Sequence, residues 1–321
     1  MKIVGMMPVY KEVDWIEYAV EGIIDFVDEL VIAEGYQGPA WHFGSCRSKD
    51  GTIDIINKLA RKYDKLTLTQ CQPRGHVLRG KAATHNHVLK ISKLIKEAQW
   101  YMICDADEFY SDRQKEILRR DIKNIDADLN SVNARMFFYN FRYFITQPLA
   151  RFIRLTDSMF FKPGQFPYYA NGKPYTKNDE SNVLLSDDPM FHYSFVKRSR
   201  QEVKRRIMEY CATQRQRYVF DWIEQVYLRW SEENAEQIYA LNNKKFNGSG
   251  IFFDGGGHDQ KLQEYLGTHP AILDHHPFRN LDDVRTVEKL SKKPMNYVQA
   301  RHHAAFKMVR FAQSIKGILR S

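Results

Sequence analysis

The chain has 321 residues, of which 43% are hydrophobic, 13% aromatic and 27% charged. This is a globular composition with ample material for a core and no low-complexity tract. Four scattered cysteines without paired spacing favour free thiols in a reducing compartment. No apolar run approaches the ~20 residues of a membrane span, and no signal-peptide pattern opens the chain. We therefore expect a cytoplasmic protein, or one bound peripherally to the cytoplasmic face of a membrane.

The net charge of +9 is concentrated at the C-terminus. From Arg285 onward, nine Lys or Arg residues stand against one acid, Glu288, which gives this tail a charge of +8. Residues 296–319 place apolar side chains at helical spacing between basic ones. This pattern fits a helix on an anionic membrane surface, and it fits a docking helix with a solvated basic face equally well. Nucleic-acid binding is not favoured, because the tail carries no known motif for it.

The first part of the chain alternates between short apolar runs and amphipathic segments. Residues 2–9, 29–33, 66–69 and 100–104 have the length and residue types of buried strands. Between them, apolar residues at helical spacing predict helices that begin near Asp14, near Asp50 or Thr52, and near Ala82. The resulting β-α-β-α-β-α-β order predicts an α/β fold, with a parallel sheet covered by helices on both faces.

Polar residues follow the predicted strands. Tyr10 and Glu12 come after the first strand, Glu34 ends the second, and Asp105 and Asp107 follow the fourth. In open α/β sheets, ligands bind beyond the carboxyl ends of the strands, so we expect a nucleotide site on this rim. For any single one of these residues, an ordinary loop position is the alternative.

The run Asp105-Ala106-Asp107 ends the fourth strand abruptly. Clustered carboxylates repel one another and resist desolvation, so fold stability does not explain them. Mg²⁺ and Mn²⁺ prefer oxygen ligands, which makes a divalent-cation site the functional interpretation. An acidic, solvated turn is the alternative.

The later segments are less regular. Residues 111–118 predict a helix, residues 131–139, 151–155 and 190–198 predict strands, and residues 199–217 and 218–230 predict two helices. A loop over residues 163–182, rich in Gly, Pro, Tyr and Asn, suggests an acceptor-binding segment. Residues 242–257 form a Gly/Asn-rich stretch without the spacing of a phosphate-binding loop. The His-rich segment 267–277 either packs the C-terminal part or holds a second metal.

Together, several of these segments resemble family 2-like glycosyltransferases of the GT-A fold, in the branch that carries Asp-Ala-Asp-Glu-Phe. The matching segments are residues 8–12, 31–35, 48–52, 81–86 and 100–109. In that family the second strand ends in an acid that contacts the nucleotide base. Glu34 stands where the family usually has Asp.

The resemblance implies a GT-A catalytic domain over residues 1–198 and a mainly helical extension over residues 199–321. It also implies a divalent cation, Mn²⁺ or Mg²⁺, with Asp107 and His192 as ligands. Related proteins often carry His-Tyr-Ser at the position of His192, and a buried histidine bonded to backbone is the alternative. The residues implied to bind the nucleotide sugar are Pro8, Val9, Tyr10, Glu12, Glu34, Asp50, Lys81, Asp105, Lys197 and Arg198.

The expected reaction is transfer of a sugar from a nucleoside-diphosphate sugar, with a UDP-sugar favoured, to a hydroxyl of a glycan, a lipid-linked glycan or a protein. An enzyme of this hexosyltransferase type that inverts needs a carboxylate base. We favour Asp179, with Glu180, Asp187 and Asp188 as alternatives. A nucleotidyltransferase and a non-catalytic basic adaptor for membranes or nucleic acid stay open as other functions. The sequence does not determine the oligomeric state.

Overall fold

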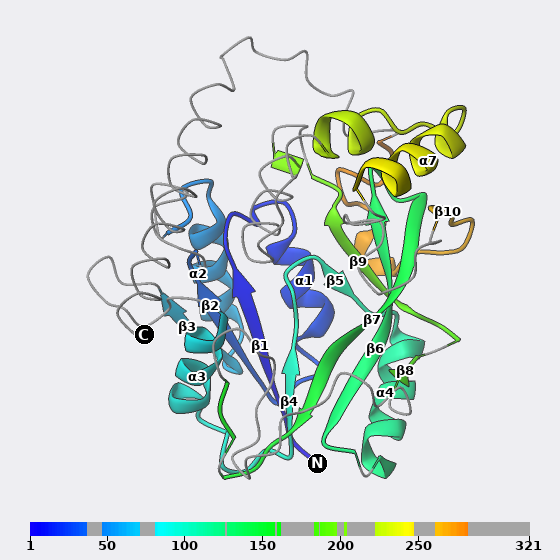
Figure 1. Cartoon of the computed structure of the whole chain (residues 1–321). Helices are drawn as coiled ribbons and strands as arrows, with labels where there is room; N and C mark the ends of the chain where they lie inside the picture. Colours follow the sequence, from blue (N-terminus) through cyan, green and yellow to red (C-terminus); the bar gives the residue numbers. More distant parts are fainter. Residues whose placement is uncertain are drawn as a thin grey trace, which may run out of the picture.

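The computed structural model describes ten stretches of the chain (Figure 1): residues 1–36, 47–70, 81–125, 127–157, 159–161, 183–185, 187–197, 202–203, 222–246 and 261–281. The predicted acceptor loop at 163–182, most of the predicted helix at 199–217 and the basic tail at 296–319 lie outside these residues. In the part of the chain that the structure describes, no helix is long and apolar enough to cross a membrane.

One half of the central sheet is parallel, as the sequence predicts. Its strands are β1 (Ile3–Val9), β2 (Glu29–Glu34), β3 (Leu66–Gln70) and β4 (Trp100–Ile103), in the order β3-β2-β1-β4. The connecting helices are α1 (Ile16–Ile23), α2 (Thr52–Lys62) and α3 (Lys81–Ile91). Alternate residues of β1 and β2 belong to two separate apolar clusters, one on each face of the sheet. The α/β class predicted from the periodicity is therefore confirmed.

The start of α2 shows how local chemistry sets the helix boundaries. Gly51 has a φ of 98°, a left-handed value that glycine adopts without steric cost. Asp50 Oδ1 accepts hydrogen bonds from the Thr52 amide at 3.2 Å and from the Thr52 hydroxyl at 2.7 Å. Of the two predicted helix starts, Thr52 is thus the first helical residue, and the Asp50 side chain satisfies its amide.

The other half of the sheet is mixed. It contains β5 (Glu108–Phe109), β6 (Leu129–Phe138), β7 (Tyr143–Arg154), β8 (Val183–Leu184) and β9 (Met190–Phe195), and the path continues from β4 as β7-β6-β9-β5. The helix α4 (Asp112–Asn124) begins with a capping box between Ser111 and Gln114, close to its predicted start. This strand order, with antiparallel strands added beside β4, gives the GT-A type of α/β fold that the resemblance implied.

Strand β7 is longer than predicted, because it begins at Tyr143 and not at Arg151. Pro148 interrupts the apolar pattern between Tyr143 and Arg151, so the first part of this strand is not evident from the sequence. The added length is stabilised by a long antiparallel ladder with β6. At the turn between them, Asn140 Oδ1 accepts from the amides of Arg142 and Tyr143 at 2.8 and 3.3 Å.

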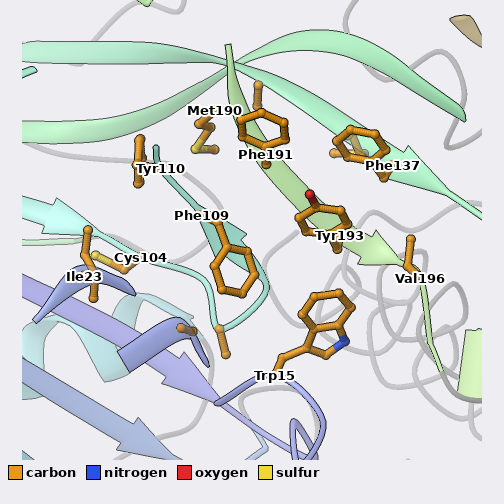
Figure 2. Close-up of a cluster of buried hydrophobic side chains, with 14 of the residues drawn as sticks. Trp15, Ile23, Cys104, Phe109, Tyr110, Phe137, Met190, Phe191, Tyr193 and Val196 are labelled. Carbon is orange, nitrogen blue, oxygen red and sulfur yellow. The ribbon is translucent and has the colours of Figure 1, made fainter. Parts of the chain in front are cut away.

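The largest apolar cluster is rich in aromatic rings (Figure 2), with Trp15 beside Phe109 and Tyr193. The Trp15 ring stacks on Tyr193 at 5.2 Å and on His276 at 4.0 Å between centroids. Because Trp15 precedes α1 while Tyr193 lies on β9, this stacking joins the two halves of the sheet.

The later chain packs onto the same core. It contributes a π-helical turn (Ile223–Tyr227), α7 (Ala235–Phe246), β10 (Gln263–Glu264) and a 3₁₀ turn (Ala271–Leu273), and β10 pairs with β7. Tyr139 donates to the Tyr227 carbonyl at 2.9 Å. The domain boundary after residue 198 stays a prediction.

The His-rich segment serves packing. His276 Nε2 lies 3.0 Å from the Asp14 carbonyl, and His269 Nδ1 lies 2.6 Å from the Tyr193 hydroxyl. Burial lowers the pKa of His269 to about 3 and that of His276 to about 4, so both rings are neutral at neutral pH. The packing alternative for this segment is therefore the one that the structure supports.

Candidate active site

The carboxyl ends of β1, β2 and β4 form one rim. Val9 at the end of β1 lies opposite Glu34 at the end of β2, and Met6 lies opposite Ile103, the last residue of β4. Asp105 and Asp107 follow β4 directly. The predicted strand-end residues therefore gather at one edge of the sheet, where β1 lies between β2 and β4 and the strand order reverses.

Glu34 is fully buried on this rim and has one satisfied oxygen. Its Oε1 accepts the Ser48 amide at 2.7 Å, whereas its Oε2 has no hydrogen-bond partner among the residues that the structure describes. Burial raises the pKa of this carboxyl and outweighs the hydrogen bonds from Ser48. A buried oxygen without a partner at a strand end is a position where a ligand N–H can bind.

The turn after β1 is tied to the turn before α2. Ser48 Oγ accepts the Lys11 amide at 2.9 Å, and Thr52 Oγ1 accepts the Glu12 amide at 3.0 Å. Lys11 has a φ of 57°. These bonds place the predicted site residues Tyr10, Glu12 and Asp50 together with Glu34, on one side of the rim.

Asp107 is buried and lies beside a buried lysine, Lys197. Lys197 Nζ donates to Asp107 Oδ2 at 3.1 Å and to Glu12 Oε2 at 2.8 Å. All three side chains are buried. Lys197, one of the residues implied to bind the nucleotide sugar, therefore links the turn after β1 to the Asp-x-Asp run. Arg198 lies outside the described residues.

His192 reaches the same place from β9. Strands β5 and β9 are antiparallel, with Glu108 paired opposite His192. His192 Nε2 lies 3.2 Å from Asp107 Oδ1 and 2.6 Å from Ser194 Oγ. Burial alone would lower the pKa of His192, but the carboxylates of Glu108, Asp107 and Asp105 outweigh it and raise that pKa. The structure thus brings together the predicted pair Asp107 and His192, while their role as metal ligands stays a prediction.

Arg151 is the main site residue that sequence reasoning missed. From β7, its Nε donates to both oxygens of Glu108 at 3.0 and 2.9 Å, and its Nη2 donates to Asp105 Oδ2 at 3.2 Å. Burial disfavours the charged guanidinium, but these carboxylates keep the pKa of Arg151 above its usual range. The available signal was an arginine inside the apolar run 151–155, because buried arginines need carboxylate partners.

Asp105 is less buried than Asp107, and its surroundings favour the ionised form. Burial alone would raise the pKa of Asp105, but Arg151, His192 and Lys81 lower it below its usual value. Lys81, a predicted binding residue at the start of α3, therefore acts electrostatically on the Asp-x-Asp run.

The donor set fits a divalent cation. Asp105, Glu108 and His192 each offer a ligand atom, and these atoms lie within 4.8 Å of one another. Asp107 adds a further carboxylate beside His192. Carboxylate oxygen and imidazole nitrogen are the ligands that Mn²⁺ and Mg²⁺ accept in proteins, imidazole suiting Mn²⁺ better.

Of the favoured base and its alternatives, only some lie in the described residues. Asp179 and Glu180 lie outside the described residues. Asp188 is described just before β9, where Arg135 Nη1 approaches its Oδ1 at 3.5 Å and Gln114 Nε2 donates to its carbonyl at 3.0 Å. Its carboxylate is thus engaged with Arg135.

No protein-family model and no curated protein matches the sequence. Among solved structures, the chain is similar to Staphylococcus aureus TarS, with 19% identity and a TM-score of 0.30 over 50% of this chain and 24% of that one. A TarS structure of residues 1–349 gives 13% identity and a TM-score of 0.41, covering 75% and 78%.

A third similar structure is Mycobacterium tuberculosis glucosyl-3-phosphoglycerate synthase in complex with Mn²⁺, UDP and glucosyl-3-phosphoglycerate. It gives 16% identity and a TM-score of 0.30, covering 43% of this chain and 44% of that one. The chain thus spans about a quarter of the first structure and under half of this third one. The strand order of the sheet gives the chain an α/β fold of the GT-A type.

Proposed function

We propose that the protein is a metal-dependent glycosyltransferase that moves a sugar from a nucleoside-diphosphate sugar to an acceptor hydroxyl. The observation that carries this proposal is the meeting of Asp107 and His192, at 3.2 Å, on the same rim as the buried carboxylate Glu34. Asp107 and His192 provide a place for a cation, and Glu34 at the end of β2 provides a place for a nucleobase.

The cation side of this rim uses Asp107 and His192, with Asp105 near the ribose or a metal-bound water. A bound Mn²⁺ or Mg²⁺ supplies positive charge to the diphosphate leaving group. Lys197 holds Asp107 in place through its 3.1 Å hydrogen bond and carries a second positive charge at the same position.

The nucleoside side uses Glu34 and the residues around it. The Oε2 of Glu34, which has no hydrogen-bond partner among the described residues, can accept an N–H from a nucleobase: the ring N–H of uracil, thymine or guanine, or the amino group of cytosine. Pro8 and Val9 end β1 beside Glu34, Tyr10 follows them, and Asp50 orders the neighbouring turn. This chemistry is compatible with UDP, and the donor screen below decides among the nucleotides.

The acceptor side is proposed more broadly. We propose a hydroxyl of a glycan, a lipid-linked glycan or a protein as acceptor. An inverting reaction needs a carboxylate near that hydroxyl, for which Asp179 stays the proposed base and Glu180 and Asp188 stay alternatives. We also propose that the protein acts in the cytoplasm, with its basic tail against an anionic membrane face.

A screen of nucleotide-sugar hydrolysis tests this function. UDP-, GDP-, dTDP- and CMP-sugars are incubated with the protein, with and without Mn²⁺. We expect turnover of at least one donor that needs Mn²⁺ and is lost in Asp107→Asn. The control is Glu29→Gln, which changes a buried carboxyl at the opposite end of β2, bonded to Ser92 and Thr67. Absence of metal-dependent turnover or binding for every donor would exclude the proposed function.

A further inference from the structure

The two ring nitrogens of His192 face two different carboxylates. Nε2 lies 2.6 Å from Ser194 Oγ and 3.2 Å from Asp107 Oδ1, whereas Nδ1 lies 3.6 Å from Glu108 Oε1. Nδ1 is buried and, within the described part of the chain, has no hydrogen-bond partner. The pairing of Glu108 opposite His192 in β5 and β9 fixes this arrangement through the backbone. A contraction of a few tenths of an ångström would turn the Nδ1 contact into a hydrogen bond.

Arg151 holds both oxygens of Glu108, including the Oε1 that faces His192 Nδ1. It donates from Nε to both Glu108 oxygens, and its Nη2 also contacts Oε1. The Glu108 side chain is 1% exposed and that of Arg151 is 9% exposed. A carboxylate buried to this degree needs a cationic partner to stay ionised, so Arg151 is what maintains an acceptor at Nδ1.

We propose that Arg151, Glu108 and His192 form a positioning relay for the cation site. Arg151 orients Glu108, and Glu108 accepts the Nδ1 proton of His192. The Nε2 lone pair is then presented beside Asp107. Histidines that bind metals commonly give their other N–H to a carboxylate, which fixes the tautomer and the ring orientation.

The relay rests on the proposed function, because it requires a cation at Asp107 and His192. Within it, Glu108 and Arg151 act through His192 and are positioning residues. It gives a role to Glu108, which the sequence left unassigned, and to Arg151, which the sequence did not single out.

A different arrangement would place the cation among Asp105, Glu108 and His192. In that arrangement the Arg151 guanidinium already bonds both oxygens of Glu108 and one oxygen of Asp105, and in the relay Lys197 likewise bonds Asp107. A cation in either arrangement would therefore lie close to a fixed positive charge, and charge alone does not choose between the two. The two arrangements also differ in the nitrogen that they use: Nε2 beside Asp107 in the relay, and Nδ1 beside Glu108 in the alternative.

Nitrogen NMR of the wild-type protein separates these arrangements without any change to the relay. The protein is labelled with ¹⁵N-histidine and titrated with Cd²⁺, a diamagnetic divalent probe, and the His192 signals are assigned by their absence in His192→Gln. The relay predicts that Cd²⁺ shifts Nε2 and that Nδ1 keeps its proton. Cadmium on Nδ1, or a proton on Nε2 in the loaded protein, would overturn it.

Mn²⁺ affinity measured by calorimetry tests the contributions of Glu108 and Arg151. We expect Glu108→Gln and Arg151→Gln each to weaken Mn²⁺ binding by about 10- to 100-fold. The matched controls are Glu29→Gln, a buried acid far from the rim, and Arg154→Gln on the same strand, which contacts Asp128 at 3.4 Å. Both controls should bind Mn²⁺ within about twofold of wild type.

The outcomes distinguish the relay from the function on which it rests. If the wild type does not bind Mn²⁺, both are contradicted. If the wild type binds Mn²⁺ and Glu108→Gln binds it equally well, the relay alone is wrong and the proposed function stands. Should Arg151→Gln fail to fold, Arg151→Lys replaces it and the NMR experiment still decides the tautomer.

Discussion

Lys197 Nζ donates a hydrogen bond to Asp107 Oδ2 at 3.1 Å, and both side chains are buried. The carboxylate that the sequence nominates as a metal ligand therefore already has a cationic neighbour. The same ammonium bonds Glu12, so the turn after β1 and the Asp-x-Asp run are held by one side chain. Positive charge at this point is thus supplied by the protein itself before any cation binds.

The first prediction concerns the stability that this lysine provides. Lys197→Met removes the ammonium that bonds the buried carboxylates of Glu12 and Asp107, which costs about 3–5 kcal/mol of unfolding free energy. Urea denaturation measures the loss. The control is Lys58→Met, which removes an exposed ion pair with Glu17 and should cost about 1 kcal/mol or less. Equal stability of the two variants would show that the buried bonds of Lys197 contribute nothing.

The second prediction concerns Glu34 and pH. Burial raises the folded-state pKa of Glu34 above its usual 4.5, so ionising this residue destabilises the fold as pH rises above 4.5. Gln at this position can still accept the Ser48 amide and carries no charge to bury. We expect Glu34→Gln to melt at a higher temperature than wild type at neutral pH. The difference should disappear below pH 4.5, and a difference independent of pH would contradict the raised pKa.

Part of this rim could be predicted from the sequence. The parallel strands β1 to β4 and their helices follow from apolar periodicity, which is a local property, and the residues at their carboxyl ends follow from the rule for open sheets. The side chains that contact those residues could not be predicted in this way. Arg151 reaches Asp105 from 46 positions away along the chain, because β7 lies antiparallel to β4. Strand pairing of this kind depends on packing and leaves no periodic signal.

A related limit applies to Lys197. Its position at the end of a predicted strand suggested binding to the nucleotide sugar, and the anions it meets are Glu12 and Asp107 of the protein itself. The separation of Lys197 from Glu12 is 185 positions, so no local pattern could pair them. Residue types thus indicated the chemistry of the site, and the fold decided which groups meet.

The third prediction links His192 to pH and metal. The folded-state pKa of His192 is raised above its usual 6.5, so its protonated form stabilises the metal-free protein. This contribution is complete below pH 6.5 and is lost as pH rises through the folded pKa. Because a metal needs the unprotonated nitrogen, Mn²⁺ affinity should rise as pH increases above 6.5 and through the folded pKa of His192. Calorimetry at several pH values checks this, and Mn²⁺ binding that does not change with pH would contradict it.

The fourth prediction concerns the basic C-terminal tail. We expect the full chain to bind anionic liposomes and to lose that binding as salt is added, because each Lys or Arg near such a surface contributes about 1 kcal/mol. Deletion of residues 296–321 should abolish the interaction, and neutral vesicles serve as the control. Sedimentation with vesicles measures it. Salt-insensitive binding, or none, would contradict a membrane role for the tail.

The most direct test of the account is nucleotide binding with and without Mn²⁺, measured by calorimetry over UDP, GDP, dTDP and CMP. The wild type should bind at least one of them more tightly when Mn²⁺ is present, by about 100-fold, since the cation's charge stabilisation is worth several kcal/mol. Asp107→Asn should lose that gain, whereas Glu29→Gln should keep it. Equal nucleotide affinity with and without Mn²⁺ in the wild type, or an undiminished gain in Asp107→Asn, would contradict the proposed metal-dependent site.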